Sequence, residues 1–133
     1  MTTLKDPSVR ELLEKPNHAV VSTHNPDGSI ESTIVWVAPE NGHIAVNSAI
    51  GRKWPENLQR DPRVTVLVRD EDNPYDFVEI RGKAEATTEG ADDHINELSK
   101  KFIGKDEYPF RQPGEERIKF VIEPEQVRHV KQD

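Results

Sequence analysis

The alternation of apolar and polar residues along this chain predicts a mainly β protein. The clearest case is Arg63–Arg69, which alternates cleanly, with Val64, Val66 and Val68 expected to point inward. Strands are expected from such patterns at His18–His24, Ser29–Ala38, His43–Ser48, Arg63–Arg69, Phe77–Thr88 and Arg117–Glu123, with a last edge strand at Val127–Lys131 after an interruption at Pro124.

Turn signals between these segments indicate antiparallel pairing. Asn25–Gly28 and Pro39–Gly42 each combine proline and glycine within four residues and predict two hairpins in close succession. Gly82 lies inside a long expected strand, a position typical of a bulge or sharp bend. A bend of this kind is a common way to curl a sheet into a barrel.

Helical patterns are fewer. Asp6 and Pro7 predict the start of a short helix that ends before Pro16, and a second short helix is expected around Pro55–Arg60. The main helix follows from apolar residues spaced four, three and four apart, with Gly104 as its stop. These residues are Ala91, Ile95, Leu98 and Phe102.

We therefore expect one domain over residues 1–133: a closed or partly closed barrel of six to seven antiparallel strands with one main helix packed outside. A barrel of this size is filled by its own side chains. A large ligand is then expected outside the barrel, in a cleft between two copies of the chain.

Composition narrows the function. The chain has 33% hydrophobic and 32% charged residues, so an oligomer or a bound ligand is expected to complete a modest core. The net charge of −7 disfavours nucleic acid as a partner. No apolar run is long enough to span a membrane, and the N-terminus does not have the pattern of a signal peptide. A cytoplasmic location is expected.

The stretch Asn47–Val64 is the candidate for binding chemistry. It joins the end of a strand to a glycine turn at Gly51 and then to a helix start, with Arg52 and Lys53 between them. Hydroxyl, backbone N–H and cationic groups together suit an anion. Residues 52–69 hold five basic and two acidic residues, a local charge of +3 on an acidic protein. The alternative is a plain connection with solvated charges.

Other chemistry is not evident. The five histidines are scattered without ligand spacing, there is no cysteine, and neither a G-x-S-x-G motif nor a glycine-rich phosphate loop occurs. No metal site is expected. The chain is then either a binding module or an enzyme whose chemistry resides in a bound cofactor.

Several motifs resemble those of a known family. They are D-G-S-I-E-S-T-I-V-W-V at Asp27–Val37, G-R-x-x-x-x-N-L-x-R-D-P-R-V at Gly51–Val64, Gly82, and E-Y-P-F-R-Q-P-G-E at Glu107–Glu115. Together they resemble the pyridoxamine 5′-phosphate oxidase-like split-barrel superfamily, and within it the oxidoreductases that use the deazaflavin coenzyme F420. The resemblance implies a homodimer of split β-barrels with the cofactor at the subunit interface.

The resemblance also implies site residues. Ser48, Arg52 and Lys53 would hold the cofactor phosphate, with Asn57 stabilising the loop or touching the ligand. The remaining implied contacts are Thr33, Ile34, Val35 and Trp36 along the ring, Phe77 near the cofactor, and Tyr108 and Pro109 closing the pocket. Tyr108 is a candidate proton donor. At Trp54, many relatives have lysine, so this residue is either a core aromatic or a cofactor contact.

The implied activity is hydride transfer between the deazaflavin and a small organic substrate. Two alternatives remain open. FMN also carries a phosphate, so the same basic motif suits an FMN-dependent flavoprotein. A non-catalytic carrier of F420 is the other alternative, since no residue in the sequence is diagnostic of turnover.

Overall fold

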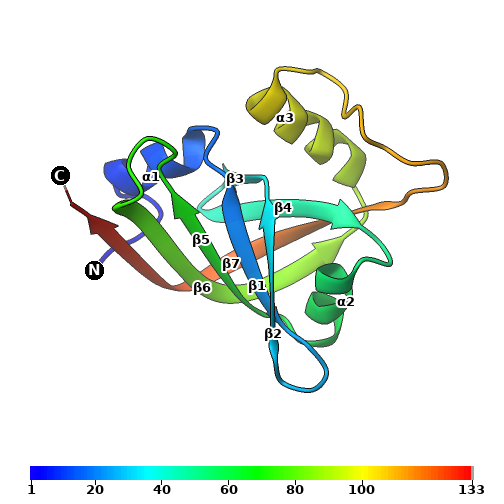
Figure 1. Cartoon of the computed structure of the whole chain (residues 1–133), viewed down its shortest axis with the longest axis horizontal. Coiled ribbons are helices and arrows are strands. Elements are labelled where there is room, and N and C mark those ends of the chain that lie inside the picture. The colour runs from blue at the N-terminus through cyan, green and yellow to red at the C-terminus, as the bar shows by residue number, and fades with distance from the viewer. Residues whose placement is uncertain (133) are drawn as a thin grey trace.

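The computed structural model describes residues 1–132. The described chain forms one antiparallel sheet of seven strands in the order β2-β1-β5-β6-β7-β4-β3, with three helices around it (Figure 1). The strands are β1 Ala19–His24, β2 Ile30–Val35, β3 Val37–Glu40, β4 His43–Ala49, β5 Arg63–Arg69, β6 Asp76–Thr87 and β7 Arg117–Lys131. The helices are α1 Pro7–Glu14, α2 Lys53–Arg60 and α3 Ala91–Ile103. The predicted mainly β barrel with one long helix outside is confirmed.

The sheet curls so that its two edge strands are neighbours in the sequence. Within residues 1–132, β2 pairs only with β1 and β3 only with β4, and the chain crosses from one edge to the other at Trp36. The prediction of one strand over Ser29–Ala38 was wrong for this reason. β1 begins at Ala19, opposite Val35, so β2 has no partner beyond that residue. The barrel is therefore split between β2 and β3.

The longest strands, β6 and β7, bend together. Their register shifts between Arg81 and Gly82, and Gly82 pairs with Pro124. A Cβ atom on Gly82 would lie 2.0 Å from the carbonyl oxygen of Glu123, so only glycine fits this approach. The bulge predicted at Gly82 is confirmed. The expected separate strand at Val127–Lys131 was wrong, because it continues β7 and pairs with β6.

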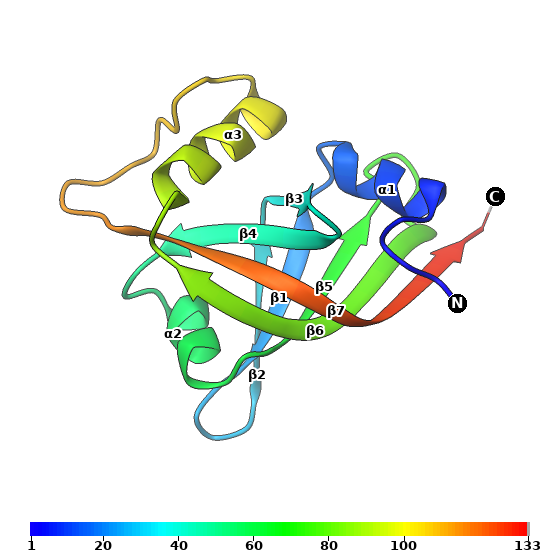
Figure 2. The same cartoon turned by 180° about the vertical axis from the view of Figure 1, so that it is seen from behind.

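The barrel interior is filled by apolar side chains. Phe120, Ile80 and Val66 are completely buried within it. α1 closes one end of the barrel with its buried stripe, and α2 lies at the opposite end (Figure 2). The buried stripe of α1 consists of Val9, Leu12 and Leu13. Among the described residues, buried side chains of this kind fill the interior, as expected from the strand number.

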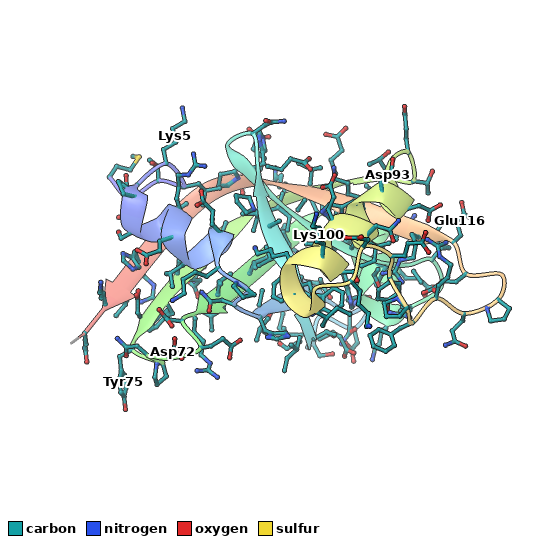
Figure 3. The ribbon with its side chains drawn as sticks, turned by 90° about the horizontal axis from the view of Figure 1, so that it is seen from above. Lys5, Asp72, Tyr75, Asp93, Lys100 and Glu116 are labelled. Atoms are coloured by element: carbon teal, nitrogen blue, oxygen red, sulfur yellow. The ribbon has the colours of Figure 1, made fainter. Side chains whose placement is uncertain are left out.

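α3 packs outside the barrel and leads into a loop, residues 104–116, that returns to β7. The loop is tied to α3, because Asn96 accepts the backbone N–H of Tyr108 at 2.9 Å and Arg111 pairs with Asp92 at 2.8 Å. Figure 3 shows this end of the molecule around Glu116, well away from Tyr75 at the other end. None of the three helices has both the length and the apolar character needed to cross a membrane.

Candidate functional site

The cavity beside the barrel

A cavity of about 330 Å³ lies where the split in the barrel meets α3 and the 104–116 loop. It is lined by residues from β2, the Trp36 crossing, the end of β4, the turn before α2, α3 and the loop. Seven residues predicted as cofactor contacts line it: Thr33, Ile34, Val35, Trp36, Ser48, Arg52 and Tyr108. Segments distant in sequence thus meet at one site.

One end of the cavity offers groups that suit an anion. Ser48 is 1% exposed, and its hydroxyl has no hydrogen-bond partner among the described residues. The guanidinium of Arg52 is about half exposed beside it, at the start of α2. Gly51, with φ of +99°, makes the turn that brings Arg52 to this position. A buried hydroxyl without a partner is a group expected to bind something else.

Behind this end lies a buried polar network that the sequence did not reveal. Arg117 donates from Nε to Oδ1 of Asn47 at 3.0 Å, which fixes the orientation of that amide. Asn47 then donates from Nδ2 to the carbonyl oxygen of Ala91 at 3.0 Å and lies 3.0 Å from Nδ1 of His94. The nitrogen Nδ1 is therefore the acceptor, and His94 carries its proton on Nε2.

His94 is neutral near physiological pH. Burial is the main cause that lowers its pKa to about 4, and the nearby Lys119 lowers it further. Its Nε2 is buried without a partner in the described chain. The ring thus fixes α3 against β4 through Asn47 and adds no charge to the site.

Glu115 completes the network. Its carboxylate Oε1 accepts from Nη1 of Arg117 at 2.6 Å and from Nη2 of Arg52 at 3.3 Å. Burial raises the pKa of Glu115, but this effect is outweighed by the backbone N–H of Gln112, by Arg117 and by Arg52, so that the pKa lies below its ordinary value. Glu115 is ionised and links the two arginines that line the cavity.

Aromatic side chains form the other wall. Trp36 stacks on Phe102 with ring centroids 5.5 Å apart, and Tyr108 meets Trp36 edge-on at 6.0 Å. Phe110 meets Tyr108 edge-on at 5.7 Å, and the guanidinium of Arg117 lies 4.9 Å from the centre of the Tyr108 ring. The wall is continuous from the barrel split to the buried arginine.

Four predicted contact residues lie outside the cavity lining, and their roles stay predictions. Lys53 pairs with Glu31 at 3.4 Å. Asn57 is buried and donates to Thr23 and Asn25 at 3.1 and 2.9 Å, which fixes α2 to the β1–β2 hairpin. The other two are Phe77, which lies under Arg128 on the outer face of β6, and the exposed Pro109.

Other residues line the cavity without having been predicted. Besides Asn47 and Arg117, they include His18, which contacts the ring of Phe102 at 5.2 Å, and Phe110. Trp54 also lines it, yet it is 5% exposed and packs against Phe120 in the core. Trp54 is therefore a core residue with one side at the cavity, and its contact with a cofactor stays a prediction.

The arrangement suits a flat conjugated ring with a phosphate. The aromatic wall and the strand residues of β2 can sandwich a ring system, while Ser48 and Arg52 can hydrogen-bond an anionic group. Within residues 1–132, no cluster of three or more histidine, aspartate or glutamate residues is placed to hold a metal ion. The cavity thus combines an aromatic wall with groups that suit an anion.

Comparison with known proteins

The sequence profile of the pyridoxamine 5′-phosphate oxidase family matches residues 6–131, nearly the whole chain. The chain belongs to this family. Its fold is accordingly the split barrel of this family, and the family resemblance seen in the sequence is confirmed. A sequence comparison with curated proteins finds no match.

Solved structures agree on the fold. A protein named F420 reductase is 24% identical, with a TM-score of 0.78 over 90% of this chain and 94% of that one. A conserved hypothetical protein of Mycobacterium tuberculosis is 20% identical, with a TM-score of 0.75 over 97% of this chain and 86% of its own. A Listeria innocua protein, named as a proposed pyridoxamine 5′-phosphate oxidase, is 24% identical, with a TM-score of 0.68 over 92% and 94%.

Proposed function

We propose that this protein is a reductase that depends on the reduced form of coenzyme F420 and works as a homodimer. Family membership supports a flavin-type cofactor, and the structural neighbour named F420 reductase supports the deazaflavin. The main support is Ser48, which lines a cavity with an aromatic wall and whose buried hydroxyl has no hydrogen-bond partner among the described residues.

The residues that would hold the cofactor divide by chemistry. Ser48 and Arg52 would bind the phosphate, because a hydroxyl and a guanidinium both donate hydrogen bonds to phosphate oxygens. The ring would lie between the β2 residues and the aromatic wall of Trp36 and Tyr108. Apolar side chains on both faces would exclude water from the ring, which matters because hydride donors react best in a dry site.

When bound, the reduced deazaflavin supplies a hydride to an electrophilic carbon of a small organic substrate, such as an activated C=C or C=N bond. The chain's own contribution is then to orient the ring and to supply a proton. Tyr108 is the candidate donor, through its phenol O–H, because it is half-buried in the aromatic wall and lines the cavity.

A second copy of the chain would complete the site. Ile34 lines the cavity but is 70% exposed, and its cross-strand neighbours Val20 and Leu67 are only half-buried. These three side chains form an apolar row across β2, β1 and β5 on the outer face of the sheet. Since this row is continuous with the cavity, covering it with a partner subunit would also enclose the cofactor.

Turnover tests the activity. Purified protein is mixed with reduced F420 and a panel of activated alkenes, imines and quinones, and the return of the oxidised deazaflavin absorbance is followed. We expect oxidation that depends on both protein and substrate, and that falls in Ser48→Ala. The control Ser8→Ala, on the exposed side of α1, should react as the wild type does. Binding of F420 without turnover of any substrate would instead indicate a carrier.

A further inference from the structure

Glu115 lies behind the anion end of the cavity without lining it. Its side chain is 5% exposed, and that of its partner Arg117 is 2% exposed. Both oxygens are bound, since Oε2 accepts the backbone N–H of Gln112 at 2.9 Å while Oε1 accepts from the arginines. The carboxylate is therefore a fixed part of the site that a ligand cannot easily displace.

The charges at this end can be counted from the contacts. Arg52 and Arg117 line the cavity with one positive charge each, and Glu115 between them carries one negative charge. The other nearby cations have partners elsewhere, because Lys53 pairs with Glu31, Arg111 with Asp92 and Lys119 with Glu40. His18, also in the lining, pairs with Glu71. The three linked groups therefore present one net positive charge.

We propose that Glu115 makes the anion end selective for a singly charged phosphodiester over a doubly charged phosphomonoester. The inference rests on the proposed function. The phosphate of F420 is a diester with one negative charge, whereas that of FMN is a monoester with nearly two at neutral pH. Glu115 would thus be the residue that distinguishes the two cofactor classes, acting through Arg52 and Arg117 rather than by contact.

The physical basis is charge matching. The cost of removing an ion from water grows with the square of its charge, while its attraction to a site of fixed charge grows only in proportion. A monoanion is compensated by the single net charge of the site. A dianion would leave one charge uncompensated next to the buried carboxylate of Glu115, where the low dielectric strengthens repulsion. We expect a difference on the order of tenfold in affinity.

A matched pair of ligands tests this directly. The probes are the deazaflavin 5′-phosphate and its methyl phosphodiester, which share the ring and the ribityl chain and differ in phosphate charge. Both are titrated into the full-length wild type and three variants by fluorescence. For the wild type, we expect the diester to bind about tenfold more tightly than the monoester.

The variants shift the ratio of the two dissociation constants in opposite directions. Glu115→Gln keeps the shape and an acceptor oxygen but raises the site to two positive charges, so the preference for the diester should shrink to about twofold or vanish. Arg52→Gln lowers the net charge of the site to zero, so both ligands should bind more weakly. The affinity for the monoester should fall further than that for the diester, so the preference for the diester should grow. Glu116→Gln is the control, because this exposed neighbour has the same charge and, among the described residues, forms no ion pair with either arginine.

Coenzyme F420 is titrated alongside to separate the two proposals. If F420 binds but the ratio is the same in the wild type and Glu115→Gln, the inference about Glu115 fails and the proposed function stands. If neither F420 nor either probe binds, both fail. A melting curve shows whether Glu115→Gln is folded. If Glu115→Gln is not folded, Arg52→Gln serves as the test, because Arg52 is about half exposed and its replacement should not unfold the chain. A ratio of the two dissociation constants that is the same in Arg52→Gln and the wild type overturns the inference.

Discussion

The indole of Trp36 lies almost parallel to the ring of Phe102, with centroids 5.5 Å apart and an angle of 9° between the planes. Trp36 marks the crossing between β2 and β3, and Phe102 lies in the last turn of α3. This stack therefore joins the split in the barrel to the helix outside it. Since both elements line the cavity, the contact sets the width of the proposed ring site.

Removing this stack should loosen α3 and weaken cofactor binding together. For Phe102→Ala, we expect a loss of about 1–3 kcal/mol in the free energy of unfolding, because the ring is half-buried and stacked. We also expect a several-fold rise in the dissociation constant of F420. Urea unfolding and fluorescence titration measure the two effects. Ile103→Ala, at an exposed neighbouring position, is the control, and equal effects of the two changes would contradict the role of the stack.

Arg52 and Lys53 are adjacent in sequence but should differ in effect. Arg52 lines the cavity, whereas Lys53 points to Glu31. We expect Arg52→Ala to weaken F420 binding by about 1.5–3 kcal/mol, the range for a hydrogen bond to a charged group. Lys53→Ala should change it little. The dissociation constants of F420 for both variants test this difference. If Lys53→Ala causes the larger loss of affinity, the phosphate lies nearer α2 than the cavity indicates.

Lys101 should make stability rise at alkaline pH. Burial lowers the pKa of Lys101 from 10.5 to about 8, and its ammonium group donates to the carbonyl oxygens of Leu13 and Val37. Between these two pKa values, the unfolded chain keeps the proton while the folded chain has lost it, so the free energy of unfolding increases with pH. Below about pH 8, the cost of burying the charge is fully present.

Urea unfolding of the wild type and Lys101→Met between pH 7 and pH 10.5 measures this effect. We expect the stability of the wild type, taken relative to the variant, to increase across the upper part of this range. Lys100→Met is the control, because the Lys100 side chain is 74% exposed. A relative stability that stays flat or falls with pH would show that Lys101 is not buried as a cation.

The apolar row around Ile34 should be the dimer interface. We expect the wild type to sediment as a dimer and Ile34→Glu to sediment mainly as a monomer, because a carboxylate on this row would be buried unpaired in the dimer. Ile103→Glu alters another exposed isoleucine, 39% exposed against 70% for Ile34, and should remain dimeric. A monomeric wild type at micromolar concentration would rule out a site shared between subunits.

The fold was largely predictable because its signals are local. Arg63–Arg69 alternates and is a strand with those bounds, and Gly82 is the bulge that its position predicted. The break at Trp36 was not predictable, since both sides of that residue are apolar. The break follows from the start of β1 at Ala19, because Val35 lies opposite Ala19 and the next residue of β2 would have no partner on β1. The end of β2 can therefore be seen only once the pairing of the two strands is known.

The candidate site was predictable only in part for the same reason. Ser48 and Arg52 lie within one continuous motif, so their proximity could be expected. Arg117 comes to Asn47 through the pairing of β4 with β7, where Ala49 lies opposite Arg117. No local pattern specifies that register. Glu115 joins the site by the same route, because it directly precedes β7 in the sequence.

The binding of F420 compared with that of FMN decides which cofactor this protein uses. Purified protein is titrated with each cofactor under the same buffer conditions, and binding is followed by fluorescence. We predict saturable binding of F420 at one molecule per chain, weaker binding of FMN, and no flavin copurifying with the protein. Tight binding of FMN, a yellow protein, or no binding of F420 at all would show that F420 is not the cofactor of this protein.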